Sequence, residues 1–258
     1  MHAHLRLPLL AGTTLALLTG AAVAAPAIGL TGDKTLVMFD TETLAVSGTM
    51  DVSGVDRLLG IDVRPADGML YGVTGDGKVV TIDTASGAAT EKSTLSETLA
   101  DGVMASVDFN PVADRLRIVG SDGTNHRANV DDGSVTIDGT LAYEAADMHA
   151  GEAPNIVAVA YTNSIGKPEA TAMYDIDATI GGLIQQAPPN DGVLKAIGKL
   201  GVTGSDNFAL DISATADLQN TAWLVTGNTL HTVDLATGAA TAVGEIEGSA
   251  LRDIAILP

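Results

Sequence analysis

The 258-residue chain contains no cysteine, which excludes disulfides, thiolate metal sites and a cysteine nucleophile. Aromatic residues make up only 3% of the sequence, which favours closely stacked sheets over a ligand pocket lined with rings. Basic residues are also scarce, since 13 Lys and Arg stand against 32 Asp and Glu, and the formal net charge is −19. A surface this acidic repels nucleic acid and anionic lipid. It suits high solubility, a salty medium or the binding of cations.

The first 24 residues have the pattern of a secretory signal peptide. MHAHLR carries one Arg and no acidic residue, and the apolar stretch LPLLAGTTLALLTGAAVA follows it. Ala22-Val23-Ala24 then gives the small-x-small pattern of a cleavage site. The apolar run is short for a membrane span and no second one follows, so no stable membrane anchor is expected. We therefore predict a signal peptide over 1–24, a single domain over 25–258, and export to the periplasm or the medium.

The rest of the chain repeats itself. The short apolar segments LGIDVRP, SVDFNP, VAVAYTN and FALDISA each begin a unit, and LRDIAIL stands alone at 251–257. From Asp62 to Asp108 is 46 residues, from Asp108 to Ala160 is 52, from Ala160 to Asp211 is 51, and from Asp211 to Asp253 is 42. Each unit holds four runs of β-branched and apolar residues separated by turns rich in Gly, Asp and Asn. Four strands in about 40 to 50 residues is the size of a propeller blade.

The two ends of the chain complete each other. LRDIAIL resembles a first strand with no blade after it, whereas 27–53 contains three strands with no first strand before them. Joined, they form one blade and leave no free sheet edge at the ring closure. The sequence therefore predicts an all-β fold, a five-bladed β-propeller whose last blade is closed by N- and C-terminal strands.

Two further features concern turns and links. Asp40, Asp83, Asp131 and Asp234 precede turns, where an Asp side chain accepts bonds from backbone amides, so we interpret them as hairpin residues. The links 96–103, predicted as a short helix, and 142–155 each join an outer strand to the next inner strand. We expect them on one face of the disc, where they would gather the following polar residues: Glu97, Asp101, Glu144, Asp147, His149 and Glu152.

The stretches VDFNPVADRLRIVGSDGTNHRANVDDGSVTIDG, AYTN and APPNDGVLKAIGKLG, together with the export signal, resemble an exported bacterial protein family, domain of unknown function 4394. The resemblance covers nearly all of the predicted mature chain, and VDFNPxxDRLRIV and PPNDG are its most specific parts. It implies a propeller-like β fold. It implies no established activity and no catalytic residues.

Motifs of known chemistry are missing from this sequence. There is no P-loop, G-x-G-x-x-G turn, G-x-S-x-G elbow or H-E-x-x-H pair, and TGDGK and SDGTN lack the spacing of an EF-hand. His126 and His231 occupy equivalent positions in different units, and His149 lies in a link. Because these histidines are separated, we interpret them as structural and predict no transition-metal site.

The aspartates of the first strands are the best candidate site residues. Strand alternation gives each first strand one bulky apolar row and one small or polar row, and the second row faces the central channel. Asp62, Asp108, Asp211 and Asp253 then form a ring that Ala160 interrupts. In one interpretation each carboxylate binds backbone amides or polar groups of the adjoining blade. In the other the carboxylates converge on a cation, because clustered like charges need a counter-charge or protons.

These observations favour an exported, non-catalytic binding or scaffolding module, acting as a monomer on an unknown small molecule or protein and needing no cofactor. One alternative is a propeller hydrolase or lyase that uses the channel aspartates as acid, base or cation ligands. Another is an extracellular structural protein stabilised by calcium.

Overall fold

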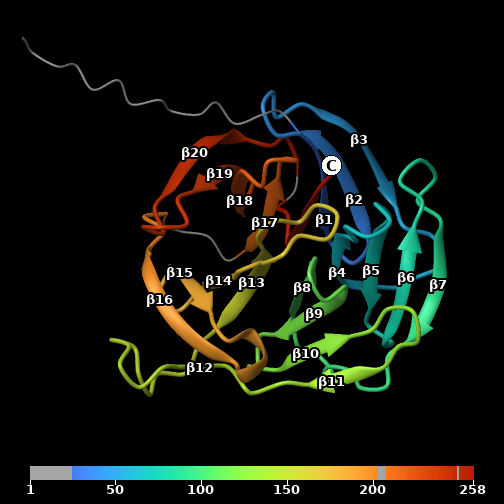
Figure 1. Cartoon of the computed structure of the whole chain (residues 1–258). Helices are drawn as coiled ribbons and strands as arrows, with labels where there is room; N and C mark the ends of the chain where they lie inside the picture. The colour runs from blue at the N-terminus through green and yellow to red at the C-terminus, as the bar shows by residue number, and fades with distance from the viewer. Residues whose placement is uncertain (1–24, 203–206, 249) are drawn as a thin grey trace, which may run out of the picture.

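The computed structural model describes residues 25–202, 207–248 and 250–258, and these form five sheets arranged radially around a common centre (Figure 1). The five-bladed propeller predicted from the repeat is therefore confirmed. The first blade comprises β4 (Leu58–Val63), β5 (Leu70–Thr74), β6 (Lys78–Ile82) and β7 (Ala89–Thr94). The second comprises β8 (Ala105–Asn110), β9 (Arg115–Gly120), β10 (Asn125–Ala128) and β11 (Val135–Ile137). The third comprises β13 (Ile156–Tyr161), β14 (Met173–Asp177), β15 (Gly182–Gln186) and β16 (Val193–Lys199), and the fourth β17 (Phe208–Ala214), β18 (Asn220–Thr226), β19 (Thr229–Val233) and β20 (Ala240–Glu245).

The remaining sheet, here named the closing blade, joins both ends of the chain as predicted. Its strands are β21 (Asp253–Ile256), β1 (Pro26–Thr31), β2 (Thr35–Asp40) and β3 (Val46–Asp51). β21 is the inner strand and pairs antiparallel with β1, with Gly29 opposite Ile254. Gly29 is required there because a Cβ atom would lie 2.4 Å from the Leu251 side chain.

Alternating side chains on the inner strands produce the core. The bulky row of each inner strand is buried, as with Ile61, Phe109 and Tyr161, and packs against the neighbouring blade. Five separate hydrophobic clusters result, and several combine residues of adjacent blades; Tyr71 of β5, for example, packs edge-on against Phe109 of β8 with ring centroids 5.3 Å apart. The small side chains of the other row leave room for the inner strands to approach the axis.

Three of the four predicted hairpin aspartates cap their turns. Asp83 accepts hydrogen bonds from the amides of Ala85 and Ser86, and Asp40 and Asp234 do the same in their blades. The prediction for Asp131 is wrong. Asn129 occupies the capping position in that hairpin, with the Asp131 amide bonded to its side chain.

Asp131 instead connects two blades. Its carboxylate receives hydrogen bonds from Arg64 of the first blade, whose guanidinium also binds Asp114, and it pairs with Lys92. The sequence pattern could not separate Asn129 from Asp131, because both are turn-forming residues within one short loop.

The links differ from expectation. Residues 96–103 form no helix; they fold over the junction of the first and second blades. The link 142–155 begins with β12 (Ala142–Tyr143), which pairs parallel with β16 and so covers the outer edge of the third blade. The one helix within the described ranges is the 3-10 turn η1 (Pro189–Asp191), and no described helix is long and apolar enough to cross a membrane. The predicted signal peptide, 1–24, lies outside the described residues.

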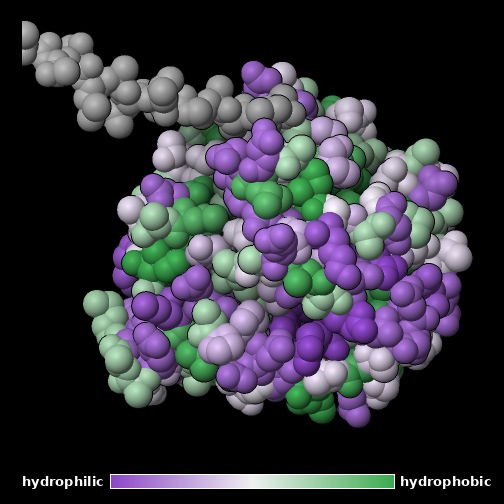
Figure 2. Space-filling model, in the orientation of Figure 1, coloured by the Kyte–Doolittle hydropathy of each residue, from purple (hydrophilic) through white to green (hydrophobic). Residues whose placement is uncertain are grey.

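The surface agrees with a small-residue, acidic composition. Figure 2 shows hydrophilic and hydrophobic residues intermixed over the visible face of the ring. Among the described residues, the large hydrophobic side chains that are exposed lie in different elements, such as Met104, Ile137 and Met148. Apolar area of this scattered kind is ordinary for a soluble surface and does not mark an interface.

Candidate functional site

The five inner strands place their small or polar side chains in levels around the channel. One level, here named the aspartate level, contains Asp62, Asp108 and Asp211 together with two alanines, Ala160 and Ala255. Oxygens of its three carboxylates lie within 4.8 Å of one another. All three aspartates are buried, with 7%, 2% and 5% of their surface exposed. The structure thus brings together three of the four aspartates predicted from the repeat.

Each carboxylate of this level accepts a hydrogen bond from the inner strand of the next blade. Asp62 accepts from the Phe109 amide at 2.7 Å and Asp108 from the Tyr161 amide at 3.0 Å. Asp211 accepts from the Ile256 amide at 2.6 Å. Buried backbone amides that lack a ladder partner require an acceptor, and the aspartates supply it. The carboxylates therefore connect successive blades.

The second oxygens of these carboxylates differ. Oδ1 of Asp62 accepts from the amide of Val63, and Oδ1 of Asp211 accepts from that of Ile212. Asp108 has no such bond: within the described part of the chain, the Tyr161 amide is the donor that binds it. Asp108 is therefore the least compensated charge of the three.

Asp253 lies one level away from the other three, contrary to the single ring expected from the sequence. Its Oδ2 accepts from the amide of Ile61 at 2.8 Å, just as the hydroxyl of Ser106 accepts from the amide of Val159 at 3.0 Å. Ser106 precedes Asp108 by two residues, so Asp253 matches Ser106 and Ala255 matches Asp108. Gly60 completes this level, and a Cβ atom there would lie 2.7 Å from Oδ2 of Asp253.

Among the described residues, one junction has no such bond. Ala160 of β13 presents no acceptor to β17, and the inner strands of the third and fourth blades meet through apolar packing of residues such as Ala158 and Leu210. At the end of the same junction Asn163 and Asn220 bind each other. The Asn163 backbone amide donates to Oδ1 of Asn220, and Nδ2 of Asn220 donates to Oδ1 of Asn163. An aspartate at Ala160 would add a fourth carboxylate to an already crowded level.

Burial and mutual repulsion alter the acidity of these groups. Burial raises the pKa of Asp211 to about 6, although its two backbone hydrogen bonds act in the opposite direction. Burial, and then the charges of its neighbours, raise the pKa values of Asp62 and Asp108 well above the ordinary range. Burial likewise raises the pKa of Asp253. Burial and mutual repulsion therefore both oppose the simultaneous ionisation of these three adjacent carboxyls, which titrate in coupled steps.

A cavity of about 780 Å³ opens beside the aspartate level where the inner strands end. Asp62 and Asp211 line it, and the rest of the described wall consists of hydroxyl, amide and apolar side chains, Ile165 and Leu257 among them. It is here named the mouth cavity. The sequence repeat indicated the aspartates but not this space, because its wall is built by turns and by the chain ends.

The polar residues of the two links do not form one site. Glu97 and Asp101 line a cavity between the first and second blades. Glu144, Asp147 and His149 line a groove along β16, where Asp147 accepts from the Ala196 amide. Glu152 accompanies them, with its carboxylate 3.0 Å from Nδ1 of His149. The link 142–155, expected on the same face as 96–103, instead adds the edge strand β12 to the third blade and continues along β16.

Comparison with known proteins agrees with a ring of this class. A structural genomics protein of unknown function from Bacteroides thetaiotaomicron is 17% identical, with a TM-score of 0.53, and the match covers 92% of this chain and 65% of that one. This chain thus spans less than two thirds of that protein, and the likeness shows the fold alone. The calcium-binding protein regucalcin from Agrobacterium tumefaciens is 14% identical over 88% of this chain and 72% of its own, with a TM-score of 0.49, too low to carry an argument. No curated protein matches this sequence.

The family assignment is decided by a direct match. The family model for domain of unknown function 4394 matches residues 35–255, from β2 to the inner strand β21. The chain belongs to this family, as the VDFNPxxDRLRIV and PPNDG stretches indicated.

We predict that Gly60→Ala destabilises the fold by about 1–3 kcal/mol, because the new methyl group meets Asp253 Oδ2 at 2.7 Å and Val107 at 2.9 Å. Urea unfolding followed by circular dichroism measures this. Gly75→Ala is the matched control, since its nearest neighbour would lie 3.9 Å away. Equal stability of the two variants would contradict the placement of Asp253 beside Gly60.

A second prediction concerns pH. A carboxyl whose folded pKa is raised, as at Asp108, contributes stability that is present below its ordinary pKa of 3.8 and lost as pH rises through the folded value. Asp108→Asn keeps an oxygen for the Tyr161 amide and removes the charge. We therefore expect the variant to melt above the wild type at pH 8, with a difference that shrinks towards pH 5.

Thermal melts of both proteins from pH 5 to 8 give this difference, and titrating groups remote from Asp108 cancel. Removal of the Asp108 charge also eases the ionisation of Asp62 and Asp211, which acts in the same direction. Asp108→Ala, which also removes the acceptor, is expected to be less stable than Asp108→Asn throughout, by about 1–3 kcal/mol for the unsatisfied amide. A difference that is constant with pH, or that grows on acidification, would show that Asp108 is not held among like charges.

Proposed function

We propose that this protein is an exported, non-catalytic binding module, active as a monomer, whose small-molecule ligand occupies the mouth cavity. The observation that carries the proposal is the position of two buried carboxylates, Asp62 and Asp211, in the wall of a cavity of about 780 Å³. Ligand sites are commonly concave spaces of about 300–1,000 Å³ with a few polar groups that fix orientation. The mouth cavity meets both conditions on a rigid ring.

The cavity wall also indicates the charge of the ligand. Its described lining contains two aspartates and no lysine, arginine or histidine. Ser213, Gln219 and Asn220 are among the neutral polar groups, and Pro65 and Ile165 add apolar surface. An anion would oppose the ionisation of both aspartates, and no basic side chain in the described lining would offset its charge. The wall therefore favours a neutral or positively charged molecule that carries hydroxyl or amino groups.

Export is supported by the sequence of residues 1–24, which is a signal pattern followed by a small-x-small site. A scaffolding role for a protein partner receives less support, because the exposed apolar side chains within the described ranges are scattered.

We predict an order of binding for three matched sugars: glucosamine binds more tightly than glucose, and glucuronate does not bind. Isothermal titration at low salt measures it, since screening weakens the charge effect. Ile165→Arg places a cation in the mouth cavity and should weaken glucosamine several-fold relative to the wild type. Ile137→Arg, on the exposed face of β11, is the control and should leave the order unchanged.

Two results would contradict the proposal. Preference for glucuronate, or no binding of any of the three sugars, would remove the mouth cavity as a site for such ligands. Turnover of esters, lactones, glycosides or phosphoesters, lost on Asp62→Asn or Asp211→Asn, would favour the alternative of a hydrolase or lyase. The raised pKa values of these residues give that alternative its chemical basis.

A second candidate function is stabilisation by calcium at the aspartate level. The observation that favours it is the convergence of three carboxylates within 4.8 Å. Calcium takes carboxylate and carbonyl oxygens, and Asp108 retains an oxygen without a hydrogen bond from any described residue. The ion would supply the counter-charge that lets the three carboxyls ionise together.

If calcium binds there, 1 mM calcium raises the melting temperature of the wild type at pH 7.5 and a chelator reverses the effect, by binding linkage to the folded state. Asp108→Asn should abolish the response, whereas Asp40→Asn, in an exposed turn, should preserve it. A wild-type protein that does not respond would exclude the calcium role and leave the proposal for the mouth cavity standing.

A further inference from the structure

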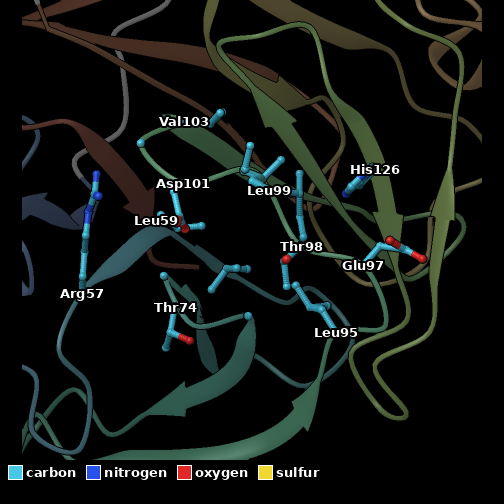
Figure 3. Close-up of a pocket in the computed structure, with 16 residues that line it drawn as sticks. Arg57, Leu59, Thr74, Leu95, Glu97, Thr98, Leu99, Asp101, Val103 and His126 are labelled. Carbon is cyan, nitrogen blue, oxygen red and sulfur yellow. The ribbon is translucent and has the colours of Figure 1, made fainter.

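A second cavity lies between the first and second blades, away from the channel aspartates. The link 96–103 covers it, and Figure 3 shows its lining residues gathered between Arg57 and His126. Its volume is about 90 Å³. Val73, Leu95 and Ile118 form the inner wall and are buried. It is here named the junction cavity.

The junction cavity contains a buried imidazole that no side chain or backbone group in the described ranges binds. His126 is only 6% exposed and projects from β10 towards the cavity (Figure 3). No described residue forms a hydrogen bond or ion pair with its ring. The ring nitrogens are not among the fully enclosed, unpartnered side-chain atoms of the described residues, which belong to Asp175 and Gln186, so they are reached from the cavity, where water or a ligand can bind them. His126 therefore provides an observation that points to an occupant.

The repeat supplies an internal comparison. His231 occupies the equivalent position on β19 and is 5% exposed, so the two rings are equally buried. Nδ1 of His231, however, lies 3.1 Å from the carbonyl oxygen of Thr229. His126 therefore lacks a partner because it faces the junction cavity, and not because of its position in the blade.

The protonation state of His126 limits the kind of ligand group that the ring can bind. Burial lowers its pKa, while the carboxylates of Glu97, Asp122 and Asp138 act in the opposite direction. The ring is therefore neutral at neutral pH, and offers one N–H donor and one acceptor nitrogen. It complements a neutral hydroxyl, which can donate to one nitrogen or accept from the other.

We propose that the junction cavity binds a small molecule that has an apolar body and one hydroxyl group, with the hydroxyl on His126 and the body against Val73, Leu95 and Ile118. The cavity, at about 90 Å³, is smaller than the roughly 150 Å³ that holds a benzene ring in an engineered protein core. The rim is exposed at Glu97, Thr98 and Asp101, so a larger body extends outwards between them.

Phenol and toluene test the proposal as a matched pair on the intact protein. An apolar cavity without a polar partner prefers toluene, because phenol loses its hydrogen bonds to water on entering. With His126 as partner, phenol should bind several-fold more tightly than toluene. Titrations followed by carbon-13 spectra of the histidine rings and the leucine and valine methyls measure both affinities. The His126 signal should shift saturably with phenol, and that of His231 should not.

Variants assign the preference to the ring. His126→Phe removes the hydrogen-bonding group and should reverse the preference in favour of toluene, whereas His231→Phe should retain preference for phenol. If His126→Phe fails to fold, the comparison of the two probes on the wild type still decides the matter. Tighter binding of toluene to the wild type, or no saturable shift at His126 with either probe, would overturn the proposal.

Discussion

The ring depends on buried carboxylates that accept hydrogen bonds from the backbone of the next blade. The five sheets are separate, and no strand ladder joins the inner strands of neighbouring blades. The backbone amides that the inner strands point towards the channel would otherwise lie buried without hydrogen-bond acceptors. Asp62, Asp108, Asp211 and Asp253 each satisfy one of them across a junction. A chain with no cysteine and few aromatic residues thus holds its centre by polar contacts from side chains that the repeat itself supplies.

Electrostatic repulsion between the buried carboxylates explains why the aspartates do not recur in every blade. Carboxylates at every position of one level would repel one another in a low-permittivity channel. The chain has Ala160 and Ala255 at two of these positions, and it displaces Asp253 to the level of Ser106, where it meets Gly60 instead of another acid. A positive group in the mouth cavity would favour the ionisation of the three aspartates that remain together, whereas an anion would oppose it. The same constraint therefore shapes both the closure of the ring and the kind of ligand that its mouth favours.

The sequence was informative wherever a repeat or an alternation recurs. Unit spacing and turn residues predicted five blades, the closure by LRDIAIL, and the aspartates of the inner strands. It could not assign Asp253 to a level, because a period of two places residues 253 and 255 on the same side of the strand, and only the pairing with its neighbours distinguishes them. Position along a hairpin was similarly ambiguous between Asn129 and Asp131.

The cavities were not predictable for a different reason. Their walls come from links and turns, such as 96–103 and the segment around Ile165, whose paths follow no periodic pattern. His126 and His231 illustrate the limit. They are equivalent in the repeat and equally buried, yet only the path of a link gives one of them a cavity and no hydrogen-bond partner. The repeat determines the scaffold, and the irregular links and turns determine where cavities form on it.

The account is tested most directly by the acidity of the channel carboxyls, read from a carbon-13 titration of the aspartate side chains with Asp62, Asp108 and Asp211 assigned by substitution. The structure predicts that Asp211 titrates near pH 6 and that Asp62 and Asp108 also titrate well above the ordinary 3.8, in coupled steps. Independent titration of all three near 3.8 would contradict a buried cluster of carboxylates at the centre of the ring.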